Sequence, residues 1–120
     1  MTETTKQKGD AYEEMAVSYL IKSGYSIVKR NFRYGNVGEV DIVAKEKDTL
    51  VFVEVRSKSK KDTVSPEETV KQNKLSKIKK VAEFYLYVNR LTDQLCRVDV
   101  ITFVSVNGLP EINHYKNVTI

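Results

Sequence analysis

The sequence contains few of the residues that build disulfide frameworks or zinc sites. Among its 120 residues there is one cysteine, Cys96, and one histidine, His114. A single cysteine excludes an internal disulfide and a cysteine-rich metal site, and a single histidine argues against a zinc site or a histidine relay. Cys96 stands in an apolar segment and is expected in the core, whereas His114 is expected on the surface of an edge strand. The sequence therefore points away from disulfide-stabilised and zinc-dependent proteins.

A long apolar run is also missing. No segment approaches the roughly 20 apolar residues that a membrane-spanning helix needs. The N-terminal sequence MTETTKQKGD is polar and does not resemble a secretory signal. We therefore expect a cytoplasmic protein that has no membrane partner.

Length and composition predict one small globular domain. The chain is 41% hydrophobic and 30% charged, which is enough apolar material for a core. We expect a disordered tail over residues 1–8 and a single domain over residues 9–120. The net charge of +4 and the pI of about 9.1 favour a polyanionic partner such as nucleic acid, although many small proteins are comparably basic.

Periodicity in the sequence predicts the order α-β-β-β-α-β-β. Apolar residues recur at helical spacing from Gly9 to about Ser23, and Gly24 follows where a helix end favours a left-handed residue. The segment 65–68, Ser-Pro-Glu-Glu, is a capping box that precedes a long second helix, and Asn107-Gly108 is typical of a hairpin turn. The expected strands are 25–34, 39–45, 49–56, 95–106 and about 111–118, with a basic loop over 57–64.

Carboxylates lie on strands that are otherwise apolar. Glu39 and Asp41 share one strand face, and Glu54 and Arg56 share a face of the next strand, because strand side chains alternate. If these strands pair, their acidic ends converge, and the resulting repulsion requires a cation. Arg56 supplies one candidate and Mg²⁺ or Mn²⁺ another, since such ions favour oxygen ligands. The spacing alone leaves open a purely structural ion pair.

Two segments resemble a known family. GEVDIVA (38–44) and LVFVEVRSK (50–58) are similar to GEIDLIA and LVFVEVK of the YraN-like family. These are small bacterial proteins thought to be endonucleases of the PD-(D/E)xK, restriction-endonuclease-like type. The resemblance extends along almost the whole chain and includes GYSIVKRNFR, SPEETV, CRVDVITF and INHYKNV.

The resemblance implies a fold, an activity and roles for particular residues. The fold is a three-layer α/β arrangement with a central mixed sheet of about five strands flanked by helices. The activity is metal-dependent hydrolysis of DNA, on branched or damaged substrates, by a protein that often works as a homodimer. Asp41 and Glu54, with the carbonyl of Val55, match the residues that hold Mg²⁺ or Mn²⁺ in the family. Glu13 matches a helix-one glutamate near the metal.

Arg56 departs from the family pattern, which has lysine at this position. Lysine can act as a proton-transfer group, whereas arginine effectively stays protonated. Arg56 suffices if the cation only stabilises charge, and Lys58 on the same face offers an ammonium from a shifted position. Two alternatives therefore remain beside the nuclease: a non-catalytic nucleic-acid-binding module, and a protein-interaction domain in which the carboxylates are structural.

Basic residues near the acidic strands are candidates for contacts to the DNA backbone. Lysines that contact phosphate position nucleic acid without reading its sequence, although a lysine-rich helix face is more often merely solvated. Tyr34 is left open between a core residue and a platform for base stacking. The candidate DNA-binding residues are Lys58, Lys60, Lys61, Lys71, Lys74 and Arg33.

Overall fold

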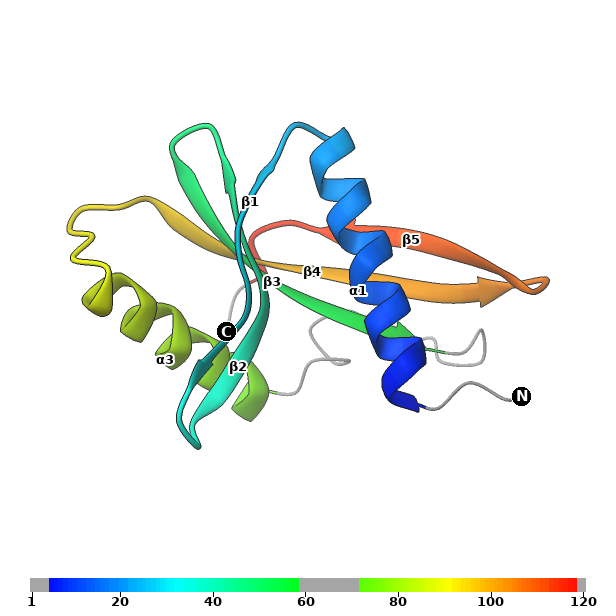
Figure 1. Cartoon of the computed structure of the whole chain (residues 1–120), viewed down its shortest axis with the longest axis horizontal. Helices are drawn as coiled ribbons and strands as arrows, with labels where there is room; N and C mark the ends of the chain where they lie inside the picture. The colour runs from blue at the N-terminus through cyan, green and yellow to red at the C-terminus, as the bar shows by residue number, and fades with distance from the viewer. Residues whose placement is uncertain (1–4, 59–71, 119–120) are drawn as a thin grey trace.

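Two helices and five strands make up the described part of the chain. The computed structural model describes residues 5–58 and 72–118 (Figure 1). The elements follow one another in the order expected from the sequence. They are α1 (Thr5–Lys22), β1 (Ser26–Tyr34), β2 (Gly38–Glu46), β3 (Thr49–Lys58), α3 (Gln72–Val88), β4 (Cys96–Val106) and β5 (Leu109–Tyr115).

The five strands form one mixed sheet in the order β1-β2-β3-β4-β5. The pairs β1–β2, β2–β3 and β4–β5 are antiparallel and are joined by short turns. The central pair, β3–β4, is parallel and is joined through a long crossover that contains α3. A parallel pair needs such a crossover because the chain has to return to the end of the sheet from which it started.

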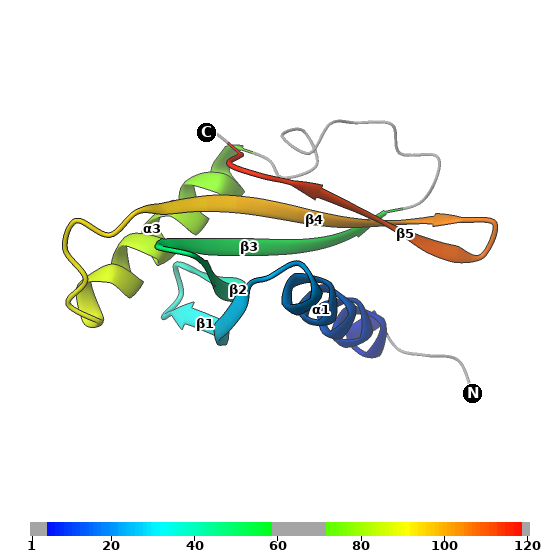
Figure 2. The ribbon, with the colours of Figure 1, turned by 90° about the horizontal axis from the view of Figure 1, so that it is seen from above.

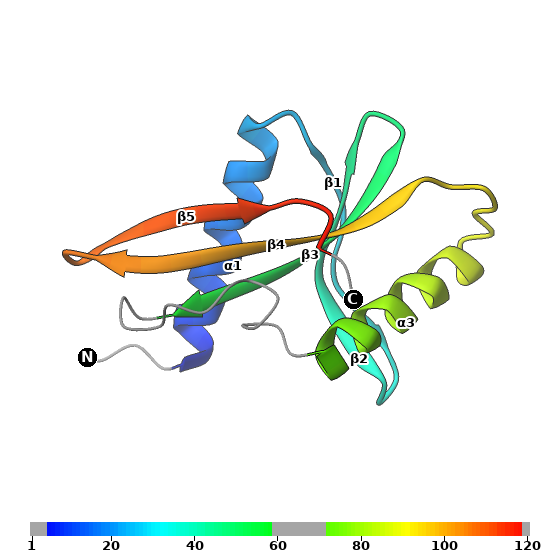
Figure 3. The ribbon, with the colours of Figure 1, turned by 180° about the vertical axis from the view of Figure 1, so that it is seen from behind.

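Alternate side chains of β3 enter two hydrophobic cores on opposite faces of the sheet. Leu50 and Phe52 pack with α3, whereas Val51 and Val53 pack with α1. Figures 1 and 3 view the sheet from opposite sides, so that α1 lies in front of it in one and behind it in the other. This is an α/β fold with three layers, and it is consistent with the restriction-endonuclease-like architecture expected from the sequence.

Local signals in the sequence correctly predict two chain reversals. Gly24 has φ of +95°, and the N–H of Tyr25 donates to the carbonyl of Leu20 at 2.9 Å, which is the 6→1 bond of a Schellman motif. Asn107 and Gly108 have φ of +51° and +79°, as a type I′ turn requires. The hairpin that they close, β4–β5, projects to the side opposite α3 (Figure 2).

Element bounds differ from expectation at three places. Helix α1 begins at Thr5, so residues 5–8, expected in a disordered tail, form its first turn. Strand β3 continues to Lys58, which shortens the basic loop expected over 57–64 at its beginning. Strand β5 begins at Leu109 and ends at Tyr115, because a tight hairpin turn continues pairing directly from Val106 to Leu109. The capping box at 65–68 lies outside the described residues.

Neither of the two described helices combines the length and the apolar character that a membrane-spanning helix requires.

Candidate active site

Strand β2 rotates at Asp41. Val40 packs in the core beneath α3, whereas Ile42, two positions further on, packs in the core beneath α1. Residues two apart in a regular strand share a face, so the strand must turn about its axis between them. The neighbouring strand turns at the same level, where Asn31 has φ of +53°. Asp41 therefore lies at a local twist in the sheet, where its side chain is not confined to either core.

The side chain of Asp41 bonds to β3 just beyond the last residue pair of the β2–β3 ladder. The ladder between these strands runs from Glu46↔Thr49 to Ile42↔Val53. Beyond it, the backbone N–H of Val55, two residues past Val53, donates to Oδ2 of Asp41, the residue next to Ile42, at 2.8 Å. The carboxylate thus takes the place of a backbone carbonyl, and it holds Asp41 against the peptide that follows Glu54.

Glu54 is a carboxylate buried beneath α3. It follows Phe52 on the α3 face of β3, and only 4% of the residue is exposed. Its Oε1 lies 3.8 Å from Nη1 of Arg56 and 3.8 Å from Nζ of Lys74, which α3 contributes. Its Oε2 is buried and has no hydrogen-bond partner within residues 5–58 and 72–118. A buried oxygen without a partner is costly, and such an atom commonly marks a site for water, an ion or a ligand.

Burial and mutual repulsion favour the protonated forms of both carboxyl groups. Burial raises the pKa of Asp41 to about 6, and the nearby charges of Glu13 and Glu39 add to the effect. Burial, followed by repulsion from Asp41, raises the pKa of Glu54 to about 7. Lys74 and Arg56 oppose this rise, but their side chains are 40% and 37% exposed, so water screens their attraction. The two cations therefore leave the acidic pair only partly neutralised.

Glu13 lies near this pair but is held by another partner. Nη2 of Arg30, on β1, lies 3.2 Å from Oε1 of Glu13, and the same guanidinium also bonds Glu14. Glu13 raises the pKa of Asp41 electrostatically, which places its charge close to Asp41. Within residues 5–58 and 72–118, no three Asp, Glu, His or Cys side chains come together as a ready-made metal-binding group.

Comparison with known proteins identifies the family. A sequence model of the family described as "Uncharacterised protein family UPF0102" matches residues 12–103. The chain belongs to the UPF0102 family. This is the YraN family, so the resemblance found in GEVDIVA and LVFVEVRSK is confirmed.

UPF0102 proteins from several bacteria match this chain over most of their length. A UPF0102 protein of Persephonella marina is 44% identical over 110 residues, which cover 92% of this chain and 90% of the relative. A UPF0102 protein of Carboxydothermus hydrogenoformans is 39% identical, with 94% and 95% covered. The UPF0102 protein CD630_12710 of Clostridioides difficile is 40% identical, with 93% and 96% covered.

The residues expected to contact DNA fall into three groups in this UPF0102 chain. Lys74 points at Glu54 and so stands within the acidic site rather than beside it. Nη2 of Arg33 lies 2.9 Å from Oε2 of Glu39, and the arginine side chain is 63% exposed. The third group lies outside the residues, or outside the side chains, that the structure describes: Lys58, Lys60, Lys61 and Lys71.

A second buried polar cluster was missed by sequence reasoning. Asp99 on β4 is fully buried and accepts hydrogen bonds from Arg97 at 2.9 Å and from the backbone N–H of Asn117 at 3.0 Å. Its Oδ2 lies 2.8 Å from Nε2 of His114, whose Nδ1 lies 3.0 Å from the Tyr19 hydroxyl. One signal was available in the sequence, because Asp99 is a carboxylate in the middle of the apolar segment CRVDVITF.

Two expectations about single residues were wrong. His114 does lie on the edge strand β5, but its side chain is only 6% exposed because α1 covers it through Tyr19 and Asp99 binds it. Cys96, expected in the core, is exposed. It is the first residue of β4, where the sheet ends, so the apolar character of the segment that follows does not bury it.

Proposed function

We propose that this UPF0102 protein is a metal-dependent endonuclease that hydrolyses phosphodiester bonds of DNA. One observation carries the proposal: the Asp41 carboxylate accepts the Val55 N–H beside Glu54 at the end of the β2–β3 ladder, and a buried oxygen of Glu54 has no hydrogen-bond partner among the described residues. Two carboxylates with raised pKa values beside two basic side chains are typical of a functional site rather than of a structural ion pair.

The donor set fits Mg²⁺ or Mn²⁺. Both carboxylates offer oxygen ligands, and these ions commonly bind one or two carboxylates while water and phosphate complete the shell. Asp41 and Glu54 would hold the ion, and the resemblance adds the carbonyl of Val55, the residue whose N–H binds Asp41. A divalent cation bound there would offset the repulsion that raises both pKa values, and would polarise a phosphate and activate water.

Arg56 and Lys74 supply the positive charge for the developing phosphorane. Both cations lie 3.8 Å from Oε1 of Glu54, one from β3 and one from α3. A fixed cation beside the site where negative charge accumulates stabilises the transition state. Lys74 also provides the ammonium that β3 lacks at position 56. The replacement of the family lysine by Arg56 is therefore compatible with catalysis.

A non-catalytic nucleic-acid-binding module is the second candidate. The observation in its favour is that Glu54 already has two cationic neighbours, so the site is partly neutralised without a metal ion. In that case the fold and the excess of basic residues would bind DNA through phosphate contacts alone.

Cleavage assays separate the two candidates. The purified chain is incubated with supercoiled plasmid, with linear duplex and with a branched DNA, in Mg²⁺, in Mn²⁺ and in EDTA. The variants Asp41→Asn and Glu54→Gln keep the side-chain shapes and remove the charges, and Glu111→Gln, an exposed carboxylate on β5, is the matched control. We expect metal-dependent cleavage by the wild type and by Glu111→Gln only.

Other results contradict the endonuclease. Cleavage that persists in both site variants indicates a contaminating nuclease. Salt-sensitive DNA binding without cleavage in any metal supports the binding module. A chain that neither cleaves DNA nor binds it at low salt contradicts both candidates and favours the protein-interaction domain.

A further inference from the structure

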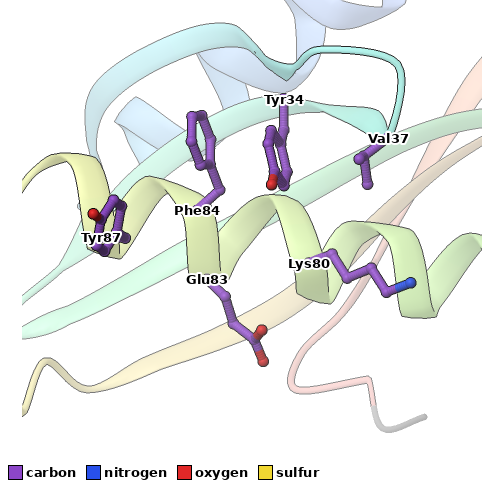
Figure 4. Close-up of a pocket in the computed structure, with 6 residues that line it drawn as sticks. All are labelled: Tyr34, Val37, Lys80, Glu83, Phe84 and Tyr87. Carbon is purple, nitrogen blue, oxygen red and sulfur yellow. The ribbon is translucent and has the colours of Figure 1, made fainter.

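Three aromatic side chains line an open pocket between α3 and the β1–β2 hairpin, away from the acidic pair. The pocket has a volume of about 480 Å³ and is bounded by Tyr34, Val37, Lys80, Glu83, Phe84 and Tyr87 (Figure 4). This volume lies within the range of small-molecule sites. We name it the Tyr34–Phe84–Tyr87 pocket after its three aromatic side chains.

The aromatic rings are arranged as a stacking platform. The rings of Tyr34 and Phe84 are parallel within 7°, with centroids 3.9 Å apart. Phe32 lies behind Phe84 at 6.0 Å between centroids, which ties the pair to the core. Tyr87, one helical turn from Phe84, is 81% exposed. The stack fixes two rings, and nothing in the fold of the described residues requires an aromatic side chain at position 87.

Charge around the pocket suits a polyanion. Figure 4 shows the Lys80 side chain extending along α3 towards its N-terminal end, and the Glu83 carboxylate pointing away from the stacked rings. Lys77 is exposed and lies one turn before Lys80. Cations beside exposed aromatic rings are the combination by which proteins bind single-stranded nucleic acid, through phosphate contacts and base stacking.

One flank of α3 connects the pocket to the acidic pair. Positions 74, 77, 80, 84 and 87 are three or four residues apart, so their side chains form a continuous row that drifts by about 140° around the helix from Lys74 to Tyr87. Lys74 contacts Glu54, and Phe84 lies ten residues further along. At 1.5 Å per residue, Lys74 and Phe84 are about 15 Å apart along the axis of α3. This distance is roughly four nucleotides at a spacing of 3.4 Å per phosphate of one strand.

We propose that the Tyr34–Phe84–Tyr87 pocket binds an unpaired base of a single-stranded DNA segment that runs along α3. The bases of a duplex are stacked inside the helix and cannot reach the rings, so the pocket favours DNA with a single-stranded part, such as a flap, a gap or a branch. The route of the single-stranded DNA from the acidic pair to the pocket rests on the proposed function. Binding of a base in the pocket does not require cleavage.

Binding without metal tests the pocket separately from catalysis. The full chain is titrated in EDTA against a fluorescent single strand and against the duplex of the same sequence. Tyr87→Ala should weaken single-strand binding at least about fivefold and change duplex binding less than twofold, because one stacked base is lost. Tyr87→Phe keeps the ring and should bind as the wild type. Tyr115→Ala removes an exposed aromatic side chain on β5 and is the matched control.

The absence of tryptophan from the chain provides a direct reporter of stacking. Tyr87→Trp introduces one indole into the pocket, and Tyr115→Trp introduces one on β5. A single strand should quench the fluorescence of Tyr87→Trp strongly, the duplex should quench it weakly, and neither should change that of Tyr115→Trp. Because Tyr87 is exposed, these variants should fold as the wild type does, which circular dichroism checks.

Three results overturn the inference. They are equal wild-type affinity for single strand and duplex, an unchanged affinity in Tyr87→Ala, and a wild-type dimer that Tyr87→Ala converts to a monomer in sedimentation, since the pocket would then be a self-interface. Single-strand binding that depends on Tyr87, without cleavage in any metal, supports the pocket and contradicts only the proposed endonuclease.

Discussion

The backbone N–H of Val55 donates to the carboxylate of Asp41 at 2.8 Å, which joins one acidic residue to the peptide that follows the other. The bond forms because pairing between β2 and β3 stops at Val53, two residues earlier on β3, which leaves this N–H for a side chain to accept. The same contact thus lies at the end of a strand ladder and holds the Asp41 carboxylate against the peptide that follows Glu54. Repulsion between the Asp41 and Glu54 carboxylates should lower the stability of the fold, whereas the proposed function requires both of them.

Substitutions of Asp41 should separate these two contributions. Asp41→Asn keeps an oxygen that can accept the Val55 N–H while it removes a charge repelled by Glu54 and Glu13, so stability at pH 8 should be unchanged or higher. Asp41→Ala leaves the N–H without this acceptor and should lower the free energy of unfolding by about 1 kcal/mol relative to Asp41→Asn. Urea unfolding measures both. Equal stability of the two variants would show that the hydrogen bond contributes nothing.

The stability of the metal-free protein should fall as pH rises from about 4.5 to 8. Folded Asp41 and Glu54 have pKa values of about 6 and about 7, above their ordinary values of 3.8 and 4.5. The folded state therefore binds protons more tightly than the unfolded state does, and the stability that it gains from this binding is lost as both groups ionise. At about 1.4 kcal/mol per pKa unit, and with the two titrations coupled, we expect a loss of about 2–4 kcal/mol.

The matched comparison for this pH effect is the double variant Asp41→Asn/Glu54→Gln. Its unfolding free energy in EDTA should change much less over the same interval, because the groups responsible no longer titrate. Mg²⁺ should stabilise the wild type more at pH 8 than at pH 5, since an ion that binds the folded state competes with protons for the carboxylates. A wild type and double variant with identical pH profiles would contradict the coupling of this pair.

Lys74 should matter for DNA cleavage as much as Arg56 does. Both cations lie at the same distance from Glu54, and removal of one transition-state donor typically costs about 10²–10³ in rate. We expect Lys74→Ala and Arg56→Ala each to lower the single-turnover cleavage rate at least about 10²-fold. Lys79→Ala, an exposed lysine on another side of α3, is the control. Cleavage by Lys74→Ala at the wild-type rate would assign Lys74 to electrostatic support of Glu54 alone.

Local chemistry explains which parts of the fold were predictable from the sequence. The Gly24 helix end and the Asn107-Gly108 turn depend on residues adjacent in the chain, and both were correctly predicted. The alternation of side chains along β3 predicted that Glu54 and Arg56 share a face, and their side chains lie 3.8 Å apart. Such features need no knowledge of how distant segments pack.

Features that depend on distant residues escaped prediction. The burial of His114 depends on Tyr19, 95 residues earlier, and on Asp99, which neither spacing nor composition connects to it. The ion pair of Lys74 with Glu54 was not predicted, because the crossover that directs α3 over Glu54 cannot be read from helix periodicity. The twist at Asp41 was likewise invisible, since a strand pattern assumes regular alternation.

The buried cluster around Asp99 should support the fold rather than the proposed chemistry. Asp99 is fully buried, and bonds from His114, Arg97 and Asn117 outweigh the effect of burial and hold its pKa below the ordinary value. Asp99→Ala leaves buried partners without their acceptor and should lower the free energy of unfolding by about 3–5 kcal/mol. Asp48→Asn, an exposed aspartate in the β2–β3 turn, should change it by less than about 0.5 kcal/mol.

The pH dependence of this cluster has the opposite sign to that of the acidic pair. Because the pKa of Asp99 is lowered in the folded state, its contribution is present above pH 4 and is lost as pH falls through the folded pKa. Wild-type stability should therefore decrease in acid, and Asp99→Asn should show a smaller decrease. At a temperature where the variant remains folded, its cleavage rate should match the wild type. A folded Asp99→Asn protein with greatly reduced cleavage would instead connect this cluster to the acidic pair through the parallel strands β3 and β4.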